Sequence, residues 1–224
     1  MNIVIRTAAC AALLATGLGL ATGTANAALH GDPGGARPYW SQQNLDDCML
    51  MAVADVVGQL TGHTPSEDEI VALASSTASQ FQSGAVYTAP ADVDDPATWN
   101  DVRAEDTTVL LAHYGITSTY TDDDVSSTGG MATGLPALEH HLDAGDRAIV
   151  FLNAETIWNQ DGDRSSGDHA VVVTGVDTDR GIVHLNDSGT EDGCDEQIAL
   201  ATFETAWAAG EHGMTVSADR GHGV

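Results

Sequence analysis

Three residues that together can carry out nucleophilic catalysis occur in the order Cys48, His169 and Asp187. A cysteine thiolate can attack an acyl carbon, a histidine can carry the proton, and a carboxylate can orient the imidazole. The residue types and their order therefore predict a thiol nucleophile with its base and its orienting group. Because Cys48 is far from the other two residues along the chain, the fold has to bring them together.

Cys48 opens a segment whose apolar residues recur at the spacing of an α-helix. The recurring positions are Met49, Val53, Val56 and Leu60, with Leu50 and Val57 beside them. Asp46 or Asp47 is a suitable N-cap, which places Cys48 in the first turn. There the unpaired backbone N–H groups and the helix dipole favour an anion, so we expect the helix start to stabilise the thiolate form.

Gln42 stands six positions before Cys48. Its side-chain amide can donate a hydrogen bond to an oxyanion that forms against the cysteine, together with the backbone N–H of Cys48. Gln43 takes this role if the local register differs by one residue. The sequence thus predicts an oxyanion hole on the segment that leads into the helix.

His169 lies on the first of two β-rich runs, residues 169–176 and 182–187. Turn-forming residues from Asp177 to Gly181 separate the runs, and this pattern predicts an antiparallel hairpin. The hairpin would carry both the base and its orienting carboxylate.

The register of this hairpin decides which residue orients His169. If the turn centres on Thr178, His169 and Asp187 face each other on one side of the hairpin. Asn186 is the rival, because an amide can also orient an imidazole, but in this register its side chain points to the opposite face. A change of one residue in the turn would reverse the choice.

The remaining patterns predict helices before and between short strands. We expect helices over 66–76, 106–114 and 135–144 and from 202, strands at 116–120, 148–153 and 214–217, and a long loop over 82–103. The helix at 66 begins with a capping box of Ser66 and Glu69. The expected fold class is α+β.

The chain resembles the papain-like cysteine peptidases, and within them the branch similar to the double-glycine peptidases that process bacteriocin leaders. The resemblance rests on the pair Gln42 and Cys48, on HAVVVTGVD from His169 and on LNDSG around Asp187, and it spans about residues 38–217. It implies a helical half that carries the cysteine helix, packed on an antiparallel sheet that carries the histidine and the aspartate.

The same resemblance assigns roles to the four residues: Cys48 as nucleophile, His169 as general base and acid, Asp187 as orienter and Gln42 in the oxyanion hole. It implies no cofactor. The chain departs from the branch at Met49, where a glycine is usual, and it lacks a transporter-like membrane region. The resemblance extends to compact secreted proteins of mycobacterial or actinobacterial type.

The N-terminal residues 1–27 have the pattern of a secretory signal peptide: Arg6, an apolar stretch, and Ala-Asn-Ala at 25–27. No later apolar run is long enough to span a membrane. We therefore expect a secreted, extracellular protein without a membrane anchor after cleavage. Its expected parts are a short segment at 28–37, one peptidase domain at 38–217 and a tail at 218–224.

Acidic residues outnumber basic ones by 33 to 7, and the chain contains no lysine. Such a charge disfavours binding to nucleic acids and to anionic membranes. It favours solubility, and the alternative interpretation is attraction of a cationic peptide or protein substrate. We expect the protein to be a monomer.

Cys194 offers a different interpretation of Cys48, because these two cysteines remain after the predicted leader is removed. A disulfide between them would make a catalytically silent binding or structural module. We expect free thiols instead, since a bridging cysteine would occupy the cleft that substrate and His169 need. A third interpretation keeps the machinery but uses it for acyl transfer of transglutaminase-like type.

Residues 161–168 resemble part of an acidic calcium loop but lack its terminal bidentate glutamate. The adjacent His140 and His141 point in different directions on a helix, which is poor chelating geometry. The sequence therefore predicts no metal site.

Overall fold

The computed structural model describes residues 29–91 and 102–218. The expected signal peptide at 1–27 lies outside the described residues, as do residues 92–101 of the expected long loop and 219–224 of the expected tail. No helix in the described part is long and apolar enough to cross a membrane.

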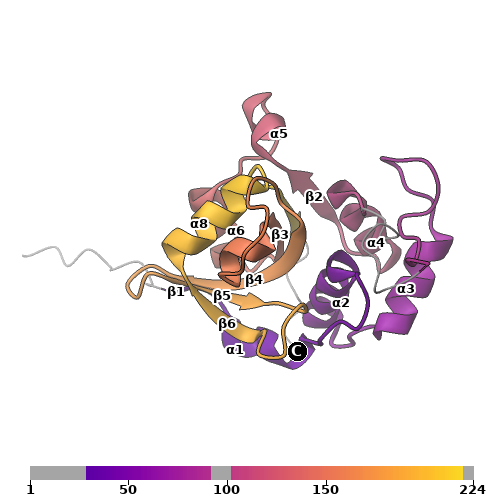
Figure 1. Ribbon diagram of the computed structural model, residues 1–224, viewed down its shortest axis with the longest axis horizontal. Coiled ribbons are helices and arrows are strands. Elements are labelled where there is room, and N and C mark those ends of the chain that lie inside the picture. The colour runs from indigo at the N-terminus through magenta and orange to yellow at the C-terminus, as the bar shows by residue number, and fades with distance from the viewer. Residues whose placement is uncertain (1–28, 92–101, 219–224) are drawn as a thin grey trace, which may run out of the picture.

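Seven strands within the described residues form one antiparallel sheet in the order β2-β7-β3-β4-β5-β6, with β1 also paired to β4 (Figure 1). The strands are β1 (Leu29–Gly31), β2 (Ser118–Thr121), β3 (Ala148–Leu152), β4 (His169–Asp177), β5 (Ile182–Asn186), β6 (Cys194–Ala199) and β7 (Met214–Ser217). The central strand β4 is buried along its whole length.

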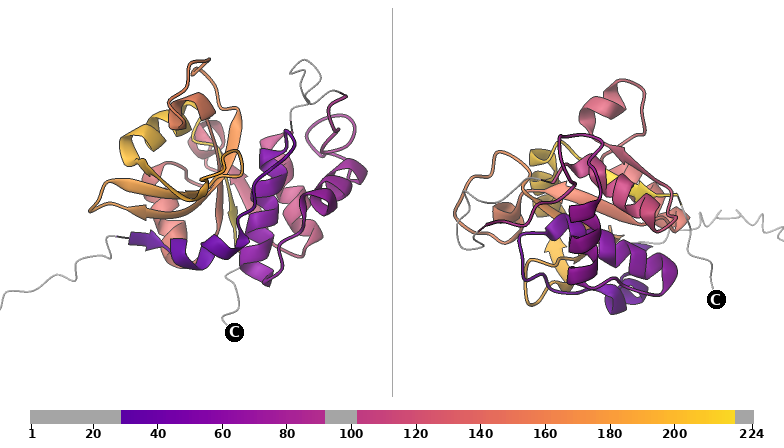
Figure 2. Two further views of the ribbon diagram at one scale, coloured as in Figure 1. Left: turned by 60° about the horizontal axis from the view of Figure 1, so that its bottom comes forward. Right: turned by 90° about the vertical axis from the view of Figure 1, so that its right-hand side faces the viewer.

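Helices cover both faces of this sheet (Figure 2). They are α1 (Pro33–Ala36), α2 (Cys48–Thr61), α3 (Glu67–Ser76), α4 (Thr107–His113), α5 (Asp123–Ser127), α6 (Leu135–Ala144), α7 (Ala154–Ile157) and α8 (Leu200–Ala209), with short 3-10 turns η1 (Arg37–Tyr39) and η3 (Ala104–Asp106). This arrangement confirms the expected α+β, papain-like class, with the cysteine helix packed on an antiparallel sheet.

The alternation of β3 and β4 divides the core into two parts. Ala170 and Val172 of β4 point to the layer of α2, α3 and α4, whereas Val171 and Val173 point to the layer of α6 and α8. Successive strand residues face opposite sides of a sheet, so two covered faces require an apolar residue at every position. The uninterrupted apolar runs in the sequence reflect this burial on both sides.

Helix α2 begins at Cys48, as the apolar spacing predicts, and ends at Gly62 with φ 78°. Its inward side chains are fully buried, among them Leu50 and Val53. Asp47 is the N-cap, but its side chain accepts no capping hydrogen bond. Packing of the apolar face on β4, rather than capping, therefore holds the start of α2 in place.

The capping box expected for α3 is present. The Ser66 hydroxyl accepts a hydrogen bond from the Glu69 backbone N–H at 3.3 Å, and the Glu69 carboxylate accepts one from the Ser66 N–H at 2.9 Å. Two of the otherwise unpaired N–H groups at the helix start are satisfied in this way.

The hairpin forms, but the register centred on Thr178 is wrong. Asp177 pairs with Ile182, so the turn contains four residues, Thr178 to Gly181, and Gly181 takes the left-handed conformation with φ 64°. An irregularity between Val173 and Gly175 shifts the register once more. His169 and Asp187 are consequently not cross-strand partners.

Several short elements carry no clear signal in the sequence. Strand β1 has three residues, and β6 is a partly exposed edge strand. Helix α8 begins at Leu200 rather than Thr202, and β2 begins two residues later than expected. The pairing of β1 with β4 draws part of the expected 28–37 segment into the sheet.

Candidate active site

Cys48 at the start of α2 meets His169 at the start of β4. Helix α2 packs along β4, and the two residues are joined by a side-chain hydrogen bond and a charge interaction. Cys48 is partly exposed, whereas the His169 side chain is buried. Cys48 thus comes from a helix and His169 from the sheet on which that helix packs.

The surroundings of His169 favour its protonated form. Burial opposes a charge on the ring, but the Cys48 sulfur and the Asp187 carboxylate outweigh burial and raise the pKa of His169 to about 10. A cationic imidazole next to the sulfur is the partner that a thiolate needs.

Asp187 Oδ1 and His169 Nε2 are joined by a hydrogen bond of 2.7 Å. Asp187 is completely buried. Since Nε2 is bound to Asp187, Nδ1 is the ring nitrogen left for Cys48. Burial raises the pKa of Asp187, but the hydrogen bond and charge of His169 outweigh burial and hold that pKa below its usual value.

Two further donors fix the Asp187 carboxylate. The backbone N–H of Gly189 donates to Oδ1 at 2.7 Å, and Trp158 Nε1 donates to Oδ2 at 2.9 Å. The Trp158 ring also packs against His169, with ring centroids 4.9 Å apart. No spacing rule links a loop tryptophan to the Asp187 carboxylate, so the sequence alone does not point to Trp158.

Gly189 completes the close packing around the imidazole. A Cβ atom at this position would lie 2.8 Å from Trp158 Cζ2 and 3.1 Å from His169 Cε1. The loop after β5 can approach His169 this closely only without a side chain at Gly189.

Asn186, the rival orienting residue, points elsewhere. Its Nδ2 donates to Asp55 of α2 at 2.7 Å and to the Ala36 carbonyl at 3.2 Å. Burial raises the pKa of Asp55 to about 6, against the lowering effect of hydrogen bonds from Gln59 and Asn186. The structure therefore brings Asp187, and not Asn186, to His169. The two residues meet although the predicted register was wrong, because Asp187 lies just beyond the end of β5.

The segment before α2 is tied to the loop that follows β5. Trp40 Nε1 donates to the Asp187 carbonyl at 2.7 Å, and the Gln43 N–H donates to the Ser188 carbonyl at 2.9 Å. The Ser188 hydroxyl also donates to Gln43 Oε1 at 2.7 Å. These hydrogen bonds fix the segment that leads into Cys48 against the loop that carries Asp187.

The two glutamines differ in their freedom. The Gln43 amide also donates to the Leu45 carbonyl at 2.9 Å, so its side chain is committed to the local structure. Gln42 is exposed and makes no hydrogen bond through its side chain to another described residue. An oxyanion-hole role for Gln42 remains a prediction.

The sequence profile of the Peptidase_C39 like family matches residues 37–213. The chain belongs to this family. An uncharacterized protein of Mycobacterium bovis and one of Mycobacterium tuberculosis are each 47% identical over 213 residues, which is 92% of both chains.

One solved structure supports the fold. A putative C39-like peptidase from Bacillus anthracis aligns with a TM-score of 0.55 and 14% identity, over 82% of this chain and 95% of that one. A double glycine motif protease from an AMS/PCAT transporter aligns with a TM-score of 0.44 and 12% identity, over 79% of this chain and 88% of that one. The family and the fold together indicate a cysteine peptidase.

Cys194 is not bonded to Cys48. Both described cysteines are free, and the Cys194 sulfur lies 3.7 Å from the Arg37 carbonyl, to which it can donate. No group of three or more potential metal ligands occurs among the residues the structure describes, the 161–168 loop included.

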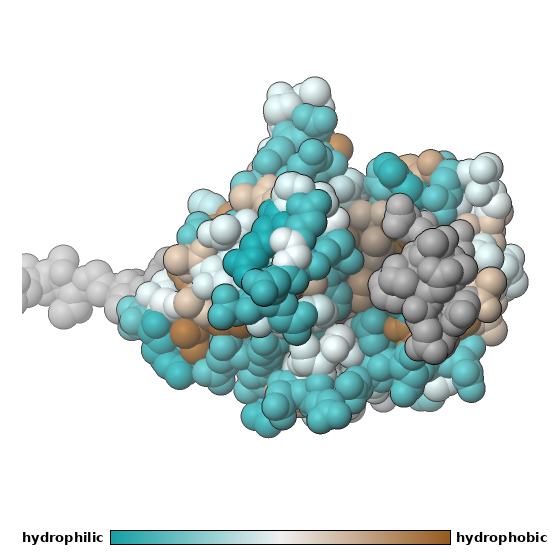
Figure 3. Space-filling model, viewed as in Figure 1, coloured by the Kyte–Doolittle hydropathy of each residue, from teal (hydrophilic) through white to brown (hydrophobic). Residues whose placement is uncertain are grey.

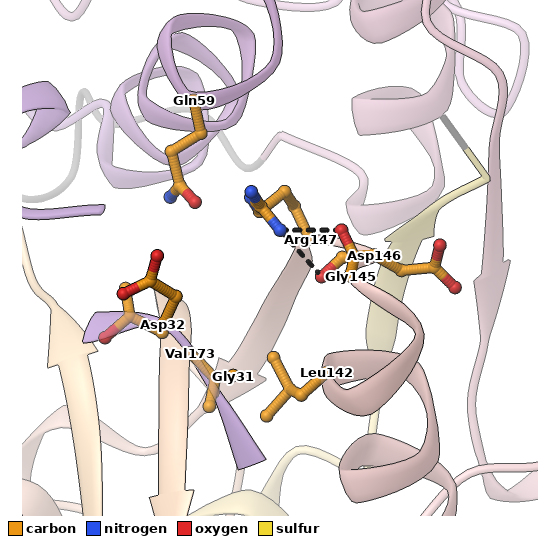
Figure 4. A pocket seen from close by; sticks show the side chains of 9 residues that line it. Gly31, Asp32, Gln59, Leu142, Gly145, Asp146, Arg147 and Val173 are labelled. Atoms are coloured by element: carbon orange, nitrogen blue, oxygen red, sulfur yellow. Dashed lines mark hydrogen bonds between the residues drawn. The ribbon is translucent and has the colours of Figure 1, made fainter. Parts of the chain in front are cut away.

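A polar cavity of about 260 Å³ lies at the other end of α2 (Figure 4). Asp32, Gln59 and Arg147 point into it, and Arg147 donates to the Gly145 carbonyl. Gln59 follows Cys48 by eleven residues, which is roughly 16 Å along the helix axis. This cavity is separate from the Cys48 site.

Proposed function

We propose that the protein is a cysteine peptidase or amidase that hydrolyses peptide or amide bonds through a thioester on Cys48. The observation that carries the proposal is the contact chain from Cys48 through His169 to Asp187, in which one imidazole touches both the sulfur and the carboxylate. A nucleophile hydrogen-bonded to a base that a third group orients is the arrangement such a reaction needs.

The proposed reaction has two halves. The Cys48 thiolate forms a bond to the acyl carbon, the carbonyl π electrons move to oxygen, and the C–N bond breaks as His169 Nδ1 gives its proton to the leaving amine. The neutral imidazole then removes a proton from water. The resulting hydroxide attacks the thioester, releases the carboxylic acid and regenerates the thiolate and imidazolium. No cofactor enters either half.

Gln42 and the backbone N–H of Cys48 are the proposed donors to the oxyanion. The exposed and unengaged amide of Gln42 supports this assignment, because Gln43 is held by Ser188 and Leu45. In that case Gln42→Ala lowers kcat about 10²- to 10³-fold. Loss of activity in a folded Gln43→Ala variant, with Gln42→Ala unaffected, would instead favour Gln43.

The proposed setting is extracellular, on the strength of the leader pattern at 1–27. The proposed substrate is a peptide or protein, and a formal net charge of −26 favours a cationic one. Figure 3 shows hydrophilic residues over much of one face of the molecule. The proposed protein is a monomer, and its excess of acidic residues disfavours binding to nucleic acids and to anionic membranes.

Two other functions could use the same residues. A silent module stapled by a Cys48–Cys194 disulfide has little support, because both thiols are free. Acyl transfer uses the same thioester and differs only in the group that attacks it. Products formed with and without an added primary amine distinguish transfer from hydrolysis.

The decisive experiment is trapping of the thiol with an epoxide, followed by intact-mass analysis without reductant. We expect one rapid adduct on wild-type protein, none of comparable rate on Cys48→Ala, and an unchanged rate on the matched control Cys194→Ser. Turnover of a protein substrate by folded Cys48→Ala would refute the assignment. Zero titratable thiols before reduction, with no activity gained on reduction, would favour the stapled module.

A further inference from the structure

Glu196 of β6 lies against the carboxylate that orients the base. It pairs with Leu185 of β5, two residues before Asp187, and its side chain is within hydrogen-bonding contact of the Asp187 carboxyl. Its Oε2 is inaccessible to solvent and receives no hydrogen bond from a described residue. If Glu196 were ionised, it would be an unpaired buried charge next to a second carboxylate, which is strongly unfavourable.

Protonation removes this conflict. Burial first, and then the negative charges of Asp187 and Asp192, raise the pKa of Glu196 to about 7, while His169 acts in the lowering direction. Below about pH 7, Glu196 is therefore largely a neutral carboxylic acid with one O–H donor.

Asp187 has an acceptor site for that donor. His169, Gly189 and Trp158 supply three hydrogen bonds to its carboxylate. An ionised carboxylate offers about four acceptor sites, so roughly one remains.

We propose that Glu196 is a positioning residue, which donates the fourth hydrogen bond to Asp187 and so helps to hold His169 toward Cys48. The inference deepens the proposed peptidase function and rests on it for its kinetic consequences. The proton stays with Glu196 throughout, and no bond to substrate is involved.

Ionisation of Glu196 replaces this hydrogen bond with repulsion between two carboxylates. The titratable groups around Glu196 are Asp187 and Asp192 from the β5–β6 connection and His169 from β4, with Cys48 of α2 beyond the imidazole. Loss of the proton therefore loosens Asp187, and we expect kcat to fall as the pH rises through about 7.

Three variants test the inference through the pH dependence of kcat on a fluorescently labelled casein. Glu196→Gln keeps an N–H donor but cannot ionise, so it retains wild-type kcat at about pH 6 and loses the decline near pH 7. Glu196→Ala lowers kcat roughly tenfold at about pH 6 with little change in KM. The control Asp192→Asn keeps full activity and moves the decline to lower pH, because one negative neighbour is gone.

A Glu196→Gln profile identical to that of the wild type would overturn the inference, as would wild-type kcat in folded Glu196→Ala. The proton magnetic resonance of the His169 Nε2–H provides a readout that needs no substrate. It should shift through about pH 7 in the wild type and not in Glu196→Gln. Such a shift without hydrolysis would retain Glu196 as a positioning residue and reject the peptidase, whereas a flat wild-type resonance would reject the role of Glu196 alone.

Discussion

Replacing Asp187 and Asn186 one at a time separates an orienting carboxylate from a structural amide. The two residues are neighbours at the end of β5, yet Asp187 binds His169 and Asn186 binds Asp55. We expect Asp187→Ala to lose activity and Asn186→Ala to lose mainly stability. Activity is the main readout for Asp187→Ala and stability is the main readout for Asn186→Ala, so each variant serves as a control for the other.

The size of each effect follows from the bonds that are lost. Without Asp187, no carboxylate orients the His169 imidazole, so kcat falls about 10²- to 10⁴-fold. Asn186→Ala removes a 2.7 Å hydrogen bond to the Asp55 carboxyl and a 3.2 Å bond to the Ala36 carbonyl. The expected loss in the free energy of unfolding is roughly 2–4 kcal/mol, which lowers Tm by about 5–15 °C in a domain of this size.

The assay combines peptide hydrolysis at neutral pH with thermal unfolding followed by circular dichroism. Asp187→Asn serves as a conservative variant, since it keeps an acceptor for His169 but places an N–H group near Trp158 Nε1, and its kcat should lie between those of the wild type and Asp187→Ala. If folded Asn186→Ala lost more activity than Asp187→Ala, the assignment of the orienter would be wrong.

Three more predictions concern the ion pair and its surroundings. Iodoacetamide should alkylate Cys48 faster than Cys194 near neutral pH, and His169→Ala should abolish that difference; an unchanged preference would count against the pair. Asp47→Asn should raise the free energy of unfolding by roughly 1–3 kcal/mol above about pH 7 and leave it unchanged below about pH 4. The reason is that burial, helped by nearby acidic groups, raises the pKa of Asp47 to about 7. The wild type alone therefore loses stability as the pH rises between these values. If urea unfolding gave the same difference in stability between the variant and the wild type at both pH values, this reasoning would be contradicted. Gly189→Ala should lower kcat with a smaller effect on KM, because the added methyl group would press on the His169 imidazole. A kcat equal to that of the wild type in the folded variant would show that the loop moves to make room for the methyl group.

Local patterns predicted the elements that bury long, regular faces. The apolar period of α2, the capping box of α3 and the apolar runs of β3 and β4 each depend on neighbours in sequence, and each element formed where expected. The order of Cys48, His169 and Asp187 was also sufficient to name three residues that the fold brings together.

The sequence-based predictions failed where contacts between distant segments determine the local structure. The turn has four residues because Asp177 caps it through the Arg180 N–H at 2.9 Å, and the composition of the loop alone does not determine that length. Strand β6 has mixed polarity since it forms an edge, so its sequence lacks a strand period. Trp158 and Glu196 could not be found by spacing, because their contacts with Asp187 exist only after three separate segments have packed.

The placement of the sulfur on α2 and of the imidazole on β4 makes the reactivity of Cys48 a measure of how well two layers stay docked. Leu50 and Val53 of α2 share one core with Ala170 and Val172 of β4. A small sliding of the helix over this surface would lengthen the sulfur-to-imidazole contact before any secondary structure was lost. Thiol alkylation rates can therefore report partial opening between the layers under mild denaturant, at concentrations where circular dichroism still records a folded protein.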